Sequence, residues 1–187
     1  MEINGRDVRF FRSVLANCEI ADASPDGDAN RLLKEQLTEG NYATSQRAAV
    51  VIITAMSRGY ETAQHVKNPA YKPRPITKEE AMSLTEPEFD ALFAEAIQEF
   101  YNGGRRTVEP EPENEKKNRK RGGRSIRLNL SWFKYYGLRM GLTITEAVNM
   151  CYGEMMDLIA CDSIYSGAQR PKAEKKKYSF DEAMSLR

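Results

Sequence analysis

Residues 105 to 125 contain almost no side chain that could enter a hydrophobic core, and this segment constrains the fold more than any other feature. Four glutamates alternate with two prolines and an asparagine from residue 109 to residue 115, and a basic run follows from Lys116 to Arg124. Such a segment cannot bury enough apolar surface to offset the entropy lost on folding. We therefore predict a charged flexible linker that divides the chain into two folding units.

The residues before this linker, 1 to 104, predict a helical domain with a minor β hairpin. Asn4-Gly5 suits the two left-handed positions of a type I′ turn. Apolar residues at helical spacing predict three helices, over 10–23, from Asp28 to Gly40, and from Thr44 or Ser45 to Gly59. The third is apolar nearly all round, which places it at the centre of a bundle. Residues 61 to 75 contain three prolines and predict a loop.

Two capping boxes predict the last helices of this domain. Thr77 with Glu80, and Thr85 with Glu88, have the spacing in which threonine accepts a backbone N–H and glutamate reaches back to the cap residue. The first box opens a short helix, and the second opens a longer one that ends at Gly103-Gly104. We therefore place the end of the N-terminal domain at residue 104.

Residues 126 to 168 predict a second, smaller helical module. An aromatic-rich helix should end at Gly141, a third capping box opens the next helix at Thr143, and a last helix ends before Gly167. We expect the basic tail, residues 169 to 187, to be disordered or to become helical on binding. The fold class is therefore mainly α, with two modules joined by the linker.

One short repeat links the two ends of the chain. The sequence Glu80–Leu84 recurs as Glu182–Leu186, and Ser179 precedes the second copy at the spacing of a fourth capping box. We interpret the repeat as a shared way of starting a helix and not as a repeat architecture.

Composition argues against several classes of function. The formal net charge is +1 and the pI about 7.6, which does not favour binding of the whole chain to nucleic acid or anionic lipid. The longest strongly apolar run, Ala48 to Met56, is too short to span a bilayer, and we expect neither a membrane partner nor a signal peptide. Cys18, Cys151 and Cys161 form no CxxC pair and predict reduced, buried thiols in the cytoplasm.

The residues that catalysis or metal binding would need form no recognisable pattern. The single histidine, His65, lies in the predicted loop, and we interpret it as a surface residue. Asp22 to Gly27 resembles the start of a calcium loop, but Leu33 stands where the loop needs a bidentate glutamate. Neither zinc-ligand spacing nor a phosphate-binding glycine loop is present. We therefore predict a protein that is not an enzyme and has no cofactor, catalytic residue or metal site.

The second module carries more aromatic and methionine side chains than so small a unit can bury. Such side chains are typical of adaptable protein-binding surfaces. We therefore predict a partner-binding site made of Trp132, Phe133, Tyr136, Tyr152, Met155 and Met156.

Two other functions stay open as alternatives. The basic run from Lys116 to Arg124 could contact phosphates in a nucleic-acid-binding regulator, although it has no interleaved aromatic residues and follows an acidic run. A small enzyme would have to use His65 or a carboxylate pair in a concave pocket. Both rank below a protein-binding function.

The chain resembles the tail assembly chaperones of long-tailed phages and prophages of Gram-positive hosts. The N-terminal resemblance is carried by Glu2–Arg6 and Cys18–Asp22, followed by Pro25–Asp28. The C-terminal resemblance is carried by Gly141–Thr143 with Glu146-Ala147, and by Tyr152–Ile159. These motifs flank most of the chain and leave the linker and tail unmatched.

The resemblance implies a division of labour between the two modules. In this family a short product contains the helical N-terminal domain, and programmed frameshifting adds a linker and a second domain. This sequence is similar to the long form, and Lys116-Lys117-Asn118 would be encoded by an A-rich stretch suited to a slippery site. The resemblance implies binding of the tape measure protein, recruitment of the major tail tube protein, action in the host cytoplasm and absence from the mature virion. Self-association is a further partner that we consider.

Overall fold

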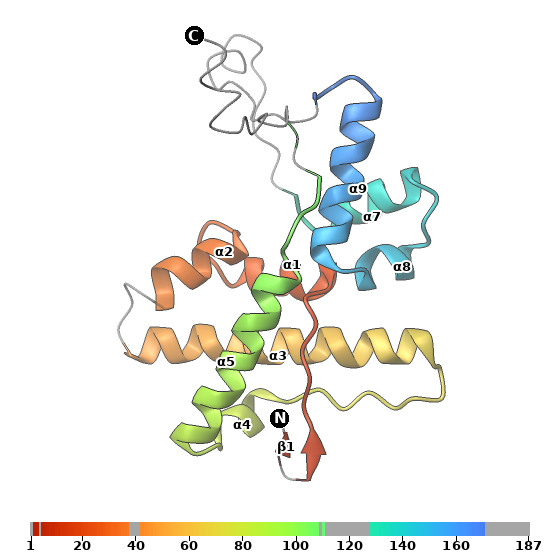
Figure 1. Cartoon of the computed structure of the whole chain (residues 1–187). Coiled ribbons are helices and arrows are strands. Elements are labelled where there is room, and N and C mark those ends of the chain that lie inside the picture. Colours follow the sequence, from red (N-terminus) through yellow and green to blue (C-terminus); the bar gives the residue numbers. More distant parts are fainter. Residues whose placement is uncertain (1, 4, 38–41, 109, 111–127, 171–187) are drawn as a thin grey trace, which may run out of the picture.

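The computed structural model describes residues 2–3, 5–37, 42–108, 110 and 128–170, and it confirms the mainly α-helical fold (Figure 1). The N-terminal part contains β1 (Glu2–Ile3), β2 (Arg6–Asp7), α1 (Val14–Asp22), α2 (Ala29–Arg31), the π-helix η1 (Leu32–Leu37), α3 (Tyr42–Lys67), α4 (Lys78–Met82) and α5 (Glu86–Asn102). The C-terminal part contains α7 (Leu130–Arg139), α8 (Ile144–Asn149) and α9 (Tyr152–Tyr165). The predicted fourth capping box at Ser179 lies outside the described residues.

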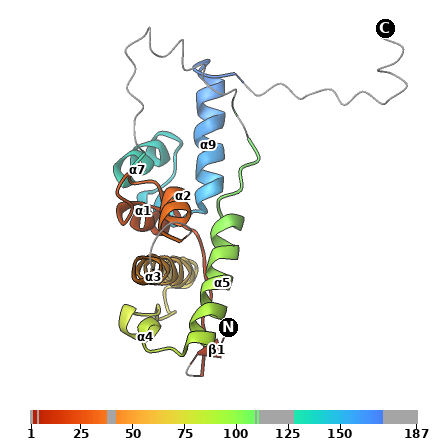
Figure 2. The ribbon, with the colours of Figure 1, turned by 90° about the vertical axis from the view of Figure 1, so that its left-hand side faces the viewer.

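The long helix α3 lies in the middle of the N-terminal part (Figure 1). Helices α1 and α2 lie on one side of α3 and α4 lies on the other, while α5 crosses it (Figure 2). Helices α7 and α9 lie beyond α1, at the end of the molecule farthest from α4. This arrangement separates the C-terminal helices from the α4 end of the fold.

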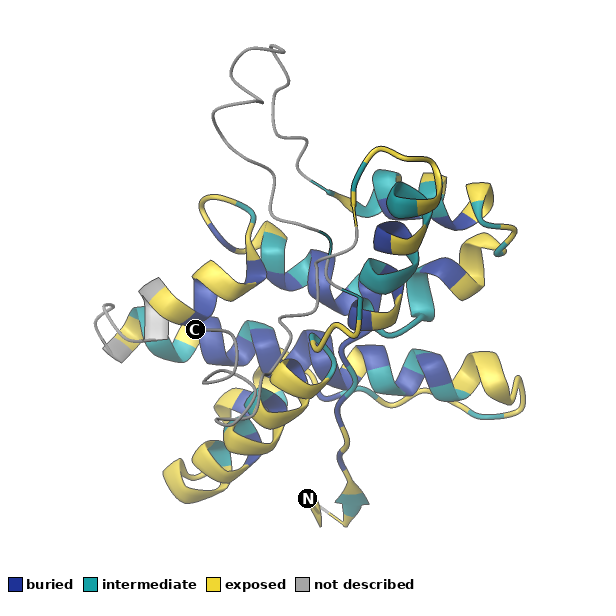
Figure 3. Ribbon diagram, turned by 45° about the horizontal axis from the view of Figure 1, so that its top comes forward, coloured by how far each residue is buried: buried dark blue, intermediate teal, exposed yellow. Residues whose placement is uncertain are grey.

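The larger hydrophobic cluster surrounds α3, as the predicted all-round apolar character of this helix requires. Ile52, Ile53 and Met56 are fully buried there, against α1, α4 and α5. In Figure 3 the buried residues gather along the middle of α3 and where neighbouring helices meet it. Burial of these apolar side chains is the main force that holds the N-terminal helices together.

The N-terminal hairpin is confirmed. Glu2 pairs with Asp7 and Ile3 with Arg6 in an antiparallel arrangement. Gly5 has φ +70°, which is the left-handed conformation expected of it in such a turn.

The first helix begins later than the prediction, which placed its start at Phe10. Residues 10 to 12 are not helical, and Phe11 N donates to Met56 O of α3 at 3.1 Å. Ser13 is the N-cap of α1, because its Oγ accepts from Ala16 N at 3.1 Å. The prediction missed this start because apolar spacing alone does not separate a helix from an extended segment packed on another helix.

The prediction that α3 ends at Gly59 is wrong, since the helix continues to Lys67. A Cβ added at Gly59 would lie 2.4 Å from Phe11 O and 3.1 Å from Ala16 Cβ. Gly59 therefore marks the place where the segment after the hairpin crosses α3 closely, and it does not stop the helix. The predicted loop consequently begins at residue 68 and not at residue 61.

We expect Gly59→Ala to destabilise the fold by about 2 kcal/mol, although alanine favours a helix by about 1 kcal/mol, because the new Cβ must push a backbone oxygen away. Urea denaturation measures the effect, and Gln64→Ala on the same helix serves as the control with no comparable clash. An increase in the unfolding free energy of Gly59→Ala would show that the crossing segment moves at no cost.

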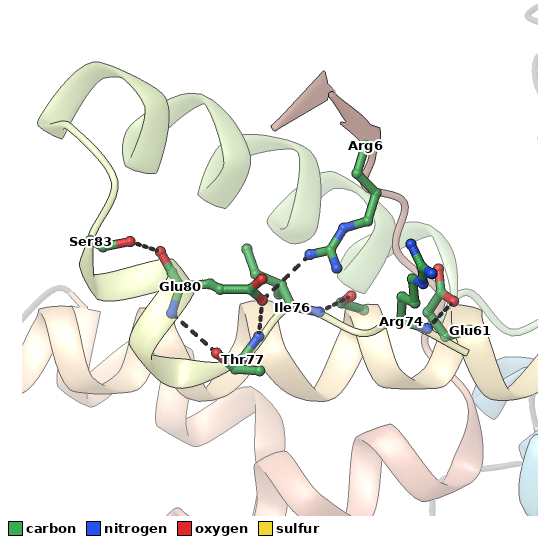
Figure 4. Close-up of polar contacts among 8 residues, drawn as sticks. Arg6, Glu61, Arg74, Ile76, Thr77, Glu80 and Ser83 are labelled. Atoms are coloured by element: carbon green, nitrogen blue, oxygen red, sulfur yellow. Dashed lines mark hydrogen bonds and ion pairs between the residues drawn. The ribbon is translucent and has the colours of Figure 1, made fainter. Parts of the chain in front are cut away.

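The connection from α3 to α4 is fixed by two side chains of α3. The Glu61 carboxylate accepts from Tyr71 Oη at 2.8 Å. It also accepts from Arg74 N at 2.7 Å, and Ser57 Oγ accepts from Ile76 N at 3.0 Å (Figure 4). These bonds satisfy backbone donors in a proline-rich segment that cannot form a helix. They bring Thr77 to the position where α4 begins.

Two of the predicted capping boxes have both reciprocal hydrogen bonds. Glu80 N donates to Thr77 Oγ1 at 3.1 Å, and Thr77 N donates to Glu80 Oε2 at 2.8 Å (Figure 4). The box of Thr143 and Glu146 has the same pair of bonds, at 3.2 and 2.8 Å. In the box of Thr85, the Glu88 carboxylate accepts from both the backbone N and the Oγ1 of the threonine.

The helix predicted from Asp28 is divided into α2 and η1. Asp28 caps its start, as predicted, with Oδ1 accepting from Asn30 N at 2.9 Å. Residues 38–40, where the prediction ended this helix, lie outside the described residues.

The C-terminal helices contact the N-terminal part directly. Val14 N donates to Met150 O at 3.0 Å, Tyr152 N donates to Arg12 O at 2.9 Å, and Gly153 N donates to Gly103 O at 2.8 Å. Val14 and Cys18 of α1 also belong to the smaller hydrophobic cluster, whose other buried members come from α7, α8 and α9. The division into two folding units stays a prediction, and any separation of them would expose this shared cluster.

The three cysteines differ in their surroundings, so the prediction of three buried thiols is wrong. Cys18 is buried, and burial raises the pKa of its thiol to about 12. Cys151 is half-buried with its Sγ 3.3 Å from Gly103 O, and Cys161 is exposed.

Within the part of the chain that the structure describes, each helix is too short or too polar to cross a bilayer.

Candidate protein-binding site

The six residues of the predicted partner-binding site lie at three different depths. Phe133 and Met155 are 1% and 0% exposed and belong to the smaller core cluster. Tyr136, Tyr152 and Met156 are half-buried and pack against that cluster. Trp132 is also half-buried, and its ring contacts other aromatic rings of α7. The structure therefore places Phe133 and Met155 beneath the surface that a partner could contact.

Helix α7 carries an aromatic face that reaches the solvent. The ring centroids of Trp132, Tyr135 and Tyr136 lie 5.6 to 6.1 Å apart in edge-on and tilted arrangements. Tyr135 is 52% exposed, and Leu138, one turn further on, is 56% exposed. We call Trp132, Tyr135, Tyr136 and Leu138 the aromatic face of α7. Large apolar side chains gathered in this way on a protein surface are typical of binding sites.

The packing of α7 on α8 decides which residues form this face. Asn129 caps α7, with Oδ1 accepting from Ser131 N at 3.1 Å and Trp132 N at 3.2 Å. A Cβ at Gly137 would lie 2.3 Å from Ala147 Cβ, so α7 and α8 meet closely there. Because Gly137 and Phe133 both face the core, the residues on the opposite side of α7 must face the solvent.

Sequence reasoning missed Tyr135 and Leu138, although a signal for them was present. Leu130, Phe133, Gly137 and Met140 recur at intervals of three and four residues, which defines the inner side of a helix. Tyr135 and Leu138 fall on the other side of that helix. Choosing aromatic and methionine residues by type alone, without regard to their side of the helix, selected inner and outer residues together.

Arg12 joins the C-terminal helices to the rest of the fold from a buried position. Its side chain is buried, with the guanidinium carbon 3.5 Å from the centroid of the Phe100 ring and 4.6 Å from that of Tyr152. Nη1 donates to Phe100 O at 2.9 Å, and Nε and Nη2 donate to Asn17 Oδ1 at 3.0 and 2.7 Å. Burial lowers the pKa of Arg12 to about 10, so the group stays charged at neutral pH.

The contacts of Arg12 are structural. Among the described residues no carboxylate forms an ion pair with it, and its charge is balanced by aromatic faces and carbonyl oxygens. Phe100 O is one of the last carbonyls of α5, which lack partners within the helix. Arg12 therefore stabilises the C-terminus of α5, where a positive charge also interacts favourably with the helix dipole.

Asp157 of α9 fixes the chain that follows α5. Its carboxylate accepts from Thr107 N at 2.8 and 3.0 Å, from Val108 N at 3.0 Å and from Thr107 Oγ1. Desolvation acts to raise the pKa of Asp157, but the hydrogen bonds from Thr107 and Val108 outweigh it and lower the pKa below the ordinary 3.8. Residues 107 and 108, which the prediction placed in the flexible linker, are thus held against α9.

Acidification is expected to release Thr107 and Val108 from Asp157. Because the folded pKa is lowered, the stabilisation is fully present above the ordinary 3.8 and is lost as the pH falls through the folded value. The amide proton shifts of both residues, followed by NMR, should titrate together below that pH and should not titrate in Asp157→Asn. A midpoint at or above 3.8 would contradict the assignment.

The side chains considered for catalysis and metal binding contact other parts of the fold, as follows. His65 is exposed, as predicted, but it lies on α3 and not in a loop, with Nδ1 2.8 Å from Tyr71 O. In the segment that resembles a calcium loop, Asp26 pairs with Arg31 and Asp28 caps α2. The described residues contain no group of three or more histidine, cysteine or carboxylate side chains that could hold a metal. The basic run from Lys116 to Arg124 lies outside the described residues.

The fold is mainly helical, and two large apolar side chains on α7, Tyr135 and Leu138, are exposed. Comparison with protein-family models, with curated proteins and with solved structures finds no match.

Proposed function

We propose that this chain is a protein-binding chaperone of phage tail assembly and that it is not an enzyme. The observation that carries the proposal is the aromatic face of α7, in which Tyr135 and Leu138 are more than half exposed beside the half-buried rings of Trp132 and Tyr136. Tryptophan and tyrosine are the residues that contribute most often to binding energy at protein interfaces. A leucine beside them adds apolar area without a group that must find a hydrogen bond.

In this proposal the C-terminal helices capture the major tail tube protein through the aromatic face of α7. The N-terminal helices bind the tape measure protein, a long and largely helical chain whose exposed apolar stripes need cover before assembly. Several weak contacts from several copies would together hold the tape measure protein while each contact stays releasable. The chaperone acts in the host cytoplasm and is absent from the mature virion.

Co-purification tests this function. The full chain is expressed with the tail genes of its own locus, and the tape measure and tail tube proteins should both be recovered with it. In the full-length chain, Tyr135→Glu/Leu138→Glu should abolish recovery of the tube protein but not of the tape measure protein, with circular dichroism used to confirm that the variant is still helical.

Two results would contradict the proposal. Recovery of neither partner by the full chain would remove the chaperone function. Recovery of nucleic acid instead, with steep dependence on salt, would favour the regulator that uses the basic run from Lys116 to Arg124.

A further inference from the structure

A groove lies at the α4 end of the molecule, far from the aromatic face of α7. It has a volume of about 350 Å³ and is open to solvent between the start of α3, α4 and the start of α5. Its apolar lining consists of Ala49, Ala81, Met82, Leu84, Phe89 and Phe93. Met82 is 64% exposed, which is unusual for a methionine in a folded chain. The groove therefore presents apolar surface that nothing in the described chain covers.

The rim of this groove is acidic. Glu86 and Asp90 lie along its edge one turn apart on α5, and both are exposed. Carboxylates at the edge of an apolar groove favour a ligand that combines apolar side chains with neighbouring positive charges.

Helix α4 forms one side of this groove, so its sequence is an example of a short helix that packs at this place. Its residues Glu80–Leu84 follow the capping threonine Thr77, and Ala81 is fully buried against the α3 core. Glu80 accepts from Thr77 N and pairs with Arg6 at 3.5 Å, which holds α4 in place (Figure 4). Small and flexible apolar residues at this position allow helices to approach closely.

The tail carries nearly the same sequence. Ser179 to Leu186 matches Thr77 to Leu84 at five identical positions, Glu-Ala-Met-Ser-Leu, and conservatively at the cap and at Asp181. As a helix, this segment would place Phe180, Ala183 and Met184 on one face, at positions i, i+3 and i+4. Its first residues follow Lys175-Lys176-Lys177, which supply the positive charge that the acidic rim favours.

The distance along the chain argues that the tail of a second copy supplies this segment. From Arg170 to Tyr178 the chain can span at most about 29 Å when fully extended. Running back along the 14 residues of α9 alone takes about 21 Å of that length. The end of α9 and the groove lie at opposite ends of the molecule, with α1 and α3 between them (Figures 1 and 2).

We propose that the groove between α3, α4 and α5 binds residues 178–186 of a second copy of this chain as a short amphipathic helix. Phe180, Ala183 and Met184 enter the apolar groove, and the preceding lysines lie beside Glu86 and Asp90. The contact is head-to-tail, because groove and tail are different surfaces of each copy, so association continues beyond a dimer unless a ring closes. This inference does not depend on the proposed function.

A complementation experiment tests the contact. The groove variant Met82→Glu/Asp90→Lys keeps its tail, and the tail variant Phe180→Glu/Met184→Glu keeps its groove. Sedimentation of the wild-type chain should show assemblies that grow with concentration, whereas each variant alone should remain monomeric. Mixing the two variants should restore one intact groove-and-tail pair and give a heterodimer.

A second measurement tests the groove directly, in case one of the variants fails to pair because it does not fold. A labelled peptide of residues 171–187 should bind the full-length tail variant, by fluorescence anisotropy, at least tenfold more tightly than it binds the groove variant. A monomeric wild-type chain at all concentrations would overturn the proposal, even with peptide binding, because the tail would then dock within its own chain. Failure of the mixed variants to pair, with both of them folded, would also overturn it.

Discussion

Replacement of Arg12 by alanine is expected to destabilise the folded chain by about 3–4 kcal/mol, which is a large share of the total stability of a domain. The substitution leaves Phe100 O and Asn17 Oδ1 buried without their donor, at about 1–3 kcal/mol each. It also removes the contact between the guanidinium and the rings of Phe100 and Tyr152. Release of the buried charge offsets part of this loss, since burial already lowers the pKa of Arg12. Urea denaturation measures the net effect.

Arg12→Lys separates the role of charge from the role of shape. A lysine keeps the positive charge but cannot donate in two directions from one plane between two rings. We therefore expect it to lose at least half as much stability as alanine does. A lysine variant as stable as the wild-type chain would show that charge alone matters at this position.

The same experiment tests whether the two predicted modules unfold together. Trp132 is the only tryptophan, so its fluorescence reports on α7, whereas far-UV circular dichroism reports on all helices. Because Val14 and Cys18 share a cluster with α7 to α9, we expect the two signals to change at the same urea concentration. An earlier change in fluorescence would support independent folding of the C-terminal helices.

Features of the fold that depend on neighbours in the sequence could be predicted. The capping boxes at Thr77 and Thr143 are correct because both partners lie within four residues of each other. The hairpin is correct for the same reason, since Gly5 needs only its own left-handed conformation. The inner side of α7 was also encoded locally, by the spacing of Phe133 and Gly137.

Features that depend on distant contacts could not be predicted. Glycine commonly ends a helix, so the sequence around Gly59 predicts a stop. Only the close approach of Phe11 to α3 shows why a glycine is needed inside this helix. Arg12 lies between Phe11 and Ser13, and the carbonyl that it binds lies 88 residues away in the sequence. In both cases the tertiary contact overrides the local preference.

The double substitution Tyr135→Glu/Leu138→Glu is expected to weaken capture of the tail tube protein at least 100-fold while leaving the fold intact. Both side chains are more than half exposed, so their replacement removes little buried area and should change the unfolding free energy by less than about 0.5 kcal/mol. A loss of about 1.4–2 kcal/mol of binding energy from each residue accounts for the weaker capture, because every 1.4 kcal/mol is tenfold. Quantitative pull-down and urea denaturation of the same preparations measure both effects.

Two controls separate the aromatic face from the core beneath it. Phe133→Ala removes a ring that is 1% exposed and should cost about 3–5 kcal/mol of stability, so any loss of capture should follow the loss of folded protein. Tyr165→Glu changes a tyrosine that is 94% exposed at the end of α9 and is not part of the aromatic face, and it should alter neither capture nor stability. If Tyr165→Glu weakens capture as much as the double variant, exposed aromatic area in general would be responsible. If the double variant captures the tube protein normally, α7 does not form the binding site, and the chaperone proposal loses the observation that carries it.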